Sequence, residues 1–182
     1  MVVINIETLE KIKRDNAFFD FENFCNKFGC SSKIAFNTAE KITYSDVNIG
    51  ADKQIYESNE SVLISFTVEL LKKMGKSNGV ISKYSENWII NKNKSYSLYK
   101  KIKESAVKNS FKGGFSVEDI DFTKEIIKAT FRYNCFSLFI LDGVVIAPSD
   151  HMEIFVWTAT EKLKKNADDL VMQYHSFGLV SC

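Results

Sequence analysis

Histidine limits the acid–base chemistry open to this chain, because only two are present and histidine is the usual general base near neutral pH. His151 follows Asp150 in a segment after Pro148, beside Ser149. With Cys135, these residues suggest a Cys–His or Ser–His–Asp set, so a small hydrolase using the Asp150–His151 loop is one hypothesis. However, sequence neighbours rarely supply the geometry of a triad, and no GxSxG or comparable nucleophile context is present. We therefore predict no catalytic residue and favour a non-enzyme.

Three carboxylates form a second candidate site. Glu118, Asp121 and Glu125 are spaced so that they share one face of a helix. Such a strip can hold a divalent cation or dock a basic partner, and it equally fits the acidic first turns and solvated face of an ordinary helix. We predict no metal site and no cofactor. The acidic strip (Glu118, Asp121 and Glu125) is kept as a candidate surface for a basic protein partner.

Charge is distributed unevenly along the chain. The formal net charge is +1, but the segment Lys72–Lys112 holds eleven lysines, no arginine and two acidic residues, a local charge of +9 against −8 elsewhere. This asymmetry favours an anionic partner or an asymmetric protein interface. The candidate contact residues of this basic segment are Lys92, Lys94, Lys100, Lys101, Lys103 and Lys108.

The basic segment also supports an alternative, nucleic-acid binding. Aromatic residues such as Trp88, Tyr96 and Tyr99 lie among its lysines, and such rings can stack on bases while lysines contact phosphates. The lack of arginine weighs against base reading, because arginine makes the bidentate contacts to phosphates and base edges. A solvated lysine face and a face for a protein partner both remain open.

Composition and length favour a folded protein-binding module. The 182 residues are 45% hydrophobic and 13% aromatic, enough for a full core, and predict one compact domain over residues 1–182. No apolar run has the roughly 18 residues of a membrane helix, and no signal peptide is recognised, so we expect a cytoplasmic protein without membrane association. Our leading hypothesis is a bacterial or phage immunity protein, that is, an antitoxin or inhibitor that neutralises a toxin or nuclease by direct contact. Its oligomeric state is left open.

Hydrophobic patterning predicts an α+β fold. An antiparallel sheet is expected around a central 135–147 hairpin and a 152–157 strand, packed by about five or six helices. Asp142-Gly143 favours a two-residue type I′ turn, in which both central residues have positive φ. The hairpin strands are apolar on both faces, which predicts a sheet covered on both sides.

Periodicity and capping signals place the other elements. Helices are predicted over 5–14, 17–28, 60–74 and 95–109, from Ser116 onward and after Thr158, with weaker strands over 42–49, 80–84 and 87–91. Ser58 or Asn59 is the expected N-cap of the 60–74 helix. Ser116 and Thr158 are the expected N-caps of the last two helices. Gly113-Gly114 lacks the spacing of a phosphate loop and is interpreted as a helix terminator.

Overall fold

The computed structural model describes residues 1–15, 32–37, 44, 51–75, 79–83, 88, 93, 96–109 and 113–181. The strands are β1 (Val3–Ile4), β2 (Ser32–Phe36), β3 (Val80–Lys83), β4 (Gly114–Ser116), β5 (Ser137–Leu141), β6 (Val144–Ser149), β7 (Glu153–Thr158) and β8 (Leu179–Ser181). The helices are α1 (Ile6–Asp15), α3 (Ala51–Lys73), α4 (Tyr96–Asn109), α5 (Ile120–Phe131) and α6 (Glu161–Tyr174), and the 3₁₀ turn η2 (His175–Phe177) follows α6.

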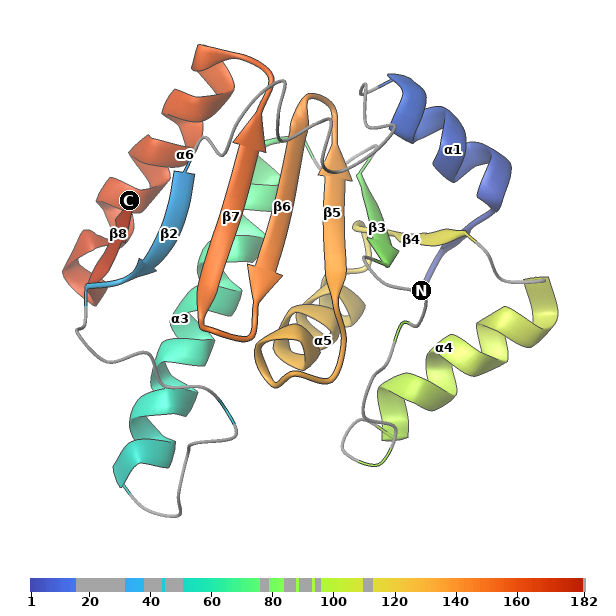
Figure 1. The fold of residues 1–182 in the computed structure, drawn as a ribbon, viewed down its shortest axis with the longest axis horizontal. Helices are drawn as coiled ribbons and strands as arrows, with labels where there is room; N and C mark the ends of the chain where they lie inside the picture. The colour runs from blue at the N-terminus through green and yellow to red at the C-terminus, as the bar shows by residue number, and fades with distance from the viewer. Residues whose placement is uncertain are drawn as a thin grey trace.

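The eight strands of the described residues form one antiparallel sheet in the order β1-β4-β3-β5-β6-β7-β2-β8 (Figure 1). The predicted α+β fold is therefore confirmed. The β5–β6 hairpin and β7 stand at the centre of the sheet, as expected, because their long apolar runs can be buried only there.

The two faces of the sheet are covered unequally. On one face, α5 packs over β5 and β6, α6 packs over β7 and β2, and α3 packs against both helices, so that together they bury the main hydrophobic core. Figure 1 shows α3 and α5 behind the central strands. On the other face, a small cluster of Leu138, Ile140, Val145 and Trp157 is joined by Ile12 from α1. Successive side chains of a strand point to opposite faces of the sheet. In each of β5, β6 and β7, therefore, neighbouring residues belong alternately to the main core and to this smaller cluster.

The hairpin turn differs from the predicted type I′. Gly143 has a φ of +66°, but the non-glycine residues with positive φ in the described part of the chain are Tyr133 and Met152, so Asp142 does not adopt the required conformation. The Gly143 carbonyl accepts a hydrogen bond from the Ala159 N–H at 2.8 Å. The turn is thus hydrogen-bonded to the segment that follows β7. The local sequence Asp142-Gly143 does not specify this contact.

Three helices begin at residues other than the predicted ones. α3 starts at Ala51, so Ser58 and Asn59 lie inside it. α5 starts at Ile120 with Asp119 as its N-cap, accepting from the Phe122 N–H at 3.0 Å, while Ser116 ends β4. α6 is likewise capped two residues later than predicted: Thr160 accepts from the Leu163 N–H at 3.3 Å, and Thr158 ends β7.

Some predicted elements lie outside the described residues. These are the 17–28 helix, the 42–49 strands except Tyr44, and the 87–91 strand except Trp88, which lies in a bend. Among the helices that the structure describes, none is long and apolar enough to cross a membrane.

Candidate functional site

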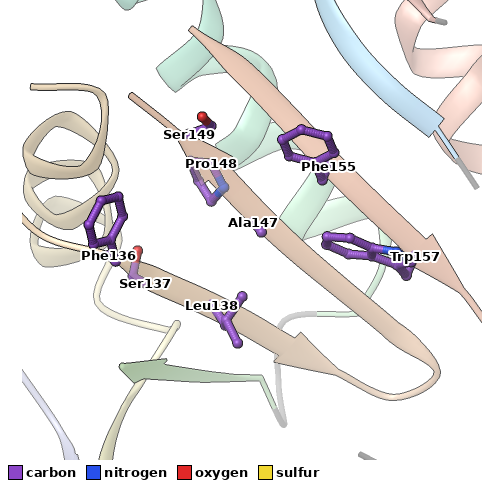
Figure 2. Close-up of a pocket in the computed structure, with 8 residues that line it drawn as sticks. All are labelled: Phe136, Ser137, Leu138, Ala147, Pro148, Ser149, Phe155 and Trp157. Carbon is purple, nitrogen blue, oxygen red and sulfur yellow. The ribbon is translucent and has the colours of Figure 1, made fainter. Parts of the chain in front are cut away.

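An apolar groove of about 380 Å³ opens on the less covered face of the sheet, across β5, β6 and β7 (Figure 2). The residues that line it are Phe136, Ser137, Leu138, Ala147, Pro148, Ser149, Phe155 and Trp157. Ala147 pairs with Phe155 in the β6–β7 register, and Trp157 is two residues further along β7, so the three side chains share one face. None of the eight lining residues is charged.

Aromatic rings dominate this groove. Phe155 and Trp157 stack along β7, with ring centroids 5.9 Å apart and planes inclined by 21°. At the other edge, Phe136 meets Tyr133 edge to face with centroids 5.5 Å apart, and Tyr133 is 53% exposed. We call the eight lining residues together with Tyr133 the aromatic groove. Large rings that combine an apolar body with partial exposure are the residues most enriched at protein interfaces.

The backbone at Tyr133 is strained. Arg132 is the C-cap of α5, the Tyr133 N–H bonds to the Thr130 carbonyl at 3.0 Å, and the Asn134 N–H bonds to the Ala129 carbonyl at 2.8 Å. This pair of bonds is the Schellman motif, whose left-handed position is usually glycine. Here Tyr133 occupies it with a φ of +57°. A β-carbon in that conformation costs about 1–2 kcal/mol, and such outliers cluster at functional sites.

Polar groups surround the aromatic groove rather than line its centre. Lys33 on β2 lies beside Phe155 in the strand register, and its Nζ is 3.6 Å from a carboxylate oxygen of Glu153, which is 6% exposed. The β6–β7 turn supplies the exposed His151. An apolar centre inside a polar rim is the usual anatomy of a protein–protein contact.

All three residues of the acidic strip are exposed, and one of them is already paired with a lysine. Glu118 precedes α5, and Glu118 and Asp121 are exposed. Both carboxylate oxygens of Glu125 accept hydrogen bonds from Lys101 Nζ at 2.7 Å. One residue of the acidic strip is thus paired with one residue of the basic segment, across α5 and α4. Among the described residues, no group of three or more His, Cys, Asp or Glu could hold a metal ion.

The structure describes only half of the basic segment's candidate residues. Lys100, Lys101 and Lys103 are exposed on α4. The Nζ of Lys100 lies 3.9 Å from Oε1 of Glu104, one turn further along the helix. Lys103 lies over the Tyr99 ring, 5.9 Å from its centroid. Lys92 and Lys94 lie outside the described residues, as does the side chain of Lys108. The lysine side chains that are described on α4 therefore contact groups of the chain itself.

Cys135 and His151 occupy opposite environments. The Cys135 thiol is completely buried, and desolvation raises its pKa to about 12 despite a hydrogen bond with Thr130. His151 is exposed, and its backbone N–H donates to Ser149 Oγ at 3.3 Å, while that hydroxyl donates to Asp150 Oδ1 at 3.3 Å. A thiol that stays protonated is a poor nucleophile, because the thiolate is the reactive form.

Cys135 is therefore expected to resist alkylation in the folded protein. Iodoacetamide treatment at pH 8, followed by peptide mass spectrometry, should leave Cys135 unmodified in buffer and modified in denaturant. Modification of native Cys135 on the timescale of an exposed cysteine would contradict its burial and revive the thiol-hydrolase hypothesis.

Sequence reasoning did not find the aromatic groove. No protein-family model matches the chain, and neither a curated protein nor a solved structure matches it. Its function must therefore be inferred from the structure itself. The most specific features of the structure are the aromatic groove and the left-handed backbone of Tyr133.

Proposed function

We propose that the chain is a non-enzymatic protein-binding module that uses the aromatic groove as its contact surface. In its most concrete form it is a cytoplasmic immunity or inhibitor protein that neutralises a toxin or nuclease by direct contact. The main support is Tyr133, an exposed ring held in a strained conformation at the edge of an uncharged groove. Strain at an exposed position is retained more readily if the ring contributes to binding.

The proposed occupant is an aliphatic or aromatic side chain projecting from the partner protein. The groove volume of about 380 Å³ accommodates such an anchor, and Phe155 and Trp157 offer it flat apolar walls. Buried aromatic pockets of this kind carry most of the energy of protein interfaces. A nucleic-acid backbone is a poorer occupant, because its phosphates would meet no cation among the lining residues.

Charged surfaces would then assist encounter instead of supplying most of the affinity. Glu118 and Asp121 are exposed and form no ion pair with any described residue, so they can steer a basic partner. On α4, Lys100 and Lys103 contact Glu104 and Tyr99 of the chain itself but remain exposed, so their charge can still steer an acidic one.

The substitution Tyr133→Gly is expected to raise the stability of the fold slightly while it weakens binding of the partner. Relief of the left-handed strain gains about 1–2 kcal/mol, and loss of the ring pair with Phe136 forfeits about 0.5–1.5 kcal/mol, so urea denaturation should show a net gain of about 0.5 kcal/mol. In contrast, the affinity for the partner should fall about 30-fold, because an aromatic hot spot contributes about 2 kcal/mol.

Affinity capture from the native cells, with quantitative mass spectrometry, measures the binding half of this prediction. The same stoichiometric protein should be retained by the wild type and by the control variant Phe177→Ala, which removes another exposed ring, and should be depleted by Tyr133→Gly. Equal capture by all three proteins would refute the aromatic groove as the contact surface. Salt-sensitive binding of oligonucleotides without any protein partner would favour the alternative function, nucleic-acid binding.

A further inference from the structure

The β6–β7 turn borders one end of the aromatic groove. Ser149, the last residue of β6, lines the groove, and its hydroxyl donates to Asp150 Oδ1 at 3.3 Å. Figure 2 shows Ser149 at this end of the groove, where β6 stops. Asp150 is half-buried, and His151 is exposed. The Asp150 carboxylate therefore lies one hydrogen bond away from a residue that lines the groove.

Met152 holds this turn in one conformation. Ser149 pairs with Glu153 in the β6–β7 register, so residues 150–152 form a three-residue hairpin loop. The left-handed position of such a loop is usually glycine, but here it is Met152, with a φ of +57°. The Met152 side chain is 7% exposed and belongs to the main hydrophobic core, and its N–H donates to the Ser149 carbonyl at 3.1 Å. Because a buried side chain anchors the loop, the Asp150 carboxylate is presented in a fixed place.

Backbone strain is concentrated at this end of the groove. Among the described residues other than glycine, Tyr133 and Met152 are the ones with positive φ. Tyr133 packs on Phe136, just before β5, and Met152 follows Ser149, at the end of β6. The start of β5 and the end of β6 lie side by side in the antiparallel hairpin, so both strained residues border the same end of the groove. Such outliers cluster at binding and catalytic sites.

Asp150 provides an uncompensated negative charge at this end. Two cations of the surroundings are already paired: Lys33 Nζ lies 3.6 Å from Glu153 Oε1. Arg132 donates to both carboxylate oxygens of Glu60. Asp150, in contrast, forms no ion pair with any residue that the structure describes. An uncharged groove beside an unpaired carboxylate is complementary to an apolar group beside a cation.

We infer that the partner carries a lysine or arginine side chain next to its apolar anchor, and that this cation pairs with Asp150. The inference rests on the proposed function, in which the aromatic groove receives the anchor. Asp150 Oδ1 accepts from Ser149, and Oδ2 is left for the charge-assisted hydrogen bond. The exposed carboxylates of Glu118 and Asp121 also favour the approach of a basic partner. An acidic or phosphorylated segment would be repelled by Asp150.

Three compounds with the same indole ring and different charges test this inference on the full chain: tryptamine (cationic), 3-ethylindole (neutral) and indole-3-propionate (anionic). The chain has two tryptophans, so the indole N–H signal of Trp157 in ¹⁵N NMR spectra reports occupation of the groove. Trp88 packs on Phe115 in the main core, and its signal is the internal control. We expect the Trp157 signal to shift with each compound, and tryptamine to bind about fivefold more tightly than indole-3-propionate, the effect of a partly exposed ion pair.

Two turn variants assign this preference to one carboxylate. Asp150→Asn keeps an oxygen that accepts from Ser149 but removes the charge, so it should abolish the preference and leave the affinity for 3-ethylindole unchanged. Asp142→Asn removes an exposed aspartate from the turn at the opposite end of β6, and should keep the preference.

The outcomes separate this inference from the proposed function. Equal affinity of the wild type for the three compounds would overturn the inference and leave the aromatic groove as an apolar contact site. A preference for tryptamine that survives in Asp150→Asn would do the same. If no compound shifted the Trp157 signal, the groove would not accept an apolar anchor, and the proposed function would fail together with the inference.

Discussion

Replacing Arg132 by methionine is expected to lower the free energy of unfolding by about 3 kcal/mol. Glu60 on α3 is 2% exposed, and its two carboxylate oxygens accept hydrogen bonds from Arg132 Nε at 2.6 Å and Nη2 at 2.7 Å. The hydrogen bond with Glu60 also raises the pKa of Arg132, so the guanidinium stays charged. Removing one member of a buried ion pair costs about 3–5 kcal/mol, and Lys128, 3.8 Å from Glu60, reduces the loss to the lower end.

Urea denaturation of two further variants shows whether the ion pair itself is responsible. Glu60→Leu combined with Arg132→Met should return to within about 1 kcal/mol of the wild type, because an apolar pair of similar volume often replaces a buried ion pair at little cost. Lys53→Met, which breaks the exposed pair with Glu57, should change stability by less than about 0.5 kcal/mol. A loss below about 1 kcal/mol in Arg132→Met would mean that solvent already screens Glu60.

The same contact explains why the start of α3 was wrongly predicted. Ser58 and Asn59 are good N-cap residues, and local propensity therefore favoured a helix beginning near residue 60. The structure extends α3 back to Ala51 because its first half is tied to α5: the Tyr56 hydroxyl donates to the Phe131 carbonyl at 2.9 Å, and Glu60 pairs with Arg132. Those partners lie more than seventy residues away in sequence, so no local pattern reports them.

Long periodic elements were predictable, and very short strands were not. α1, α4, the β5–β6 hairpin and β7 follow from their own hydrophobic spacing. Strands of two or three residues, such as β1 (Val3–Ile4), β4 (Gly114–Ser116) and β8 (Leu179–Ser181), carry no periodicity and exist through their neighbours. Gly113-Gly114 is an example: a β-carbon at Gly114 would lie 2.6 Å from the Ile81 carbonyl oxygen, and one at Gly113 would overlap that of Ile4. These glycines allow β1, β4 and β3 to approach, a role that the expected helix terminator did not include.

The candidate sites depended still more on tertiary structure. The sequence showed that β5 and β6 are apolar on both faces, but the open part of the second face depends on where α1 places Ile12. Nor did the sequence show that Tyr133 takes the left-handed position after α5, because glycine or asparagine is the usual signal for it.

Replacing Phe115 by alanine is expected to lower the free energy of unfolding by about 4 kcal/mol. Its fully buried ring packs against Trp88 and Phe122, with centroids 5.0 and 4.9 Å away, both edge to face. A buried phenylalanine cut to alanine costs about 3–5 kcal/mol through lost burial and the cavity left behind. Two ring contacts place this change in the upper half of that range.

Denaturation monitored by tryptophan fluorescence measures this loss, because Trp88 reports directly on the cavity beside it. Phe115→Leu should restore more than half of the lost stability, since it refills much of the volume without the edge-to-face contacts. Phe177→Ala removes the same ring from a site that is 60% exposed, and should change stability by less than about 0.5 kcal/mol. Equal losses in Phe115→Ala and Phe177→Ala would mean that the ring cluster adds nothing beyond the size of the side chain. The expected difference requires Phe115 to join β4 to α5 through Phe122. Phe115 would then help to fix the helix that carries Glu125 and Lys128 and that ends at its C-cap, Arg132.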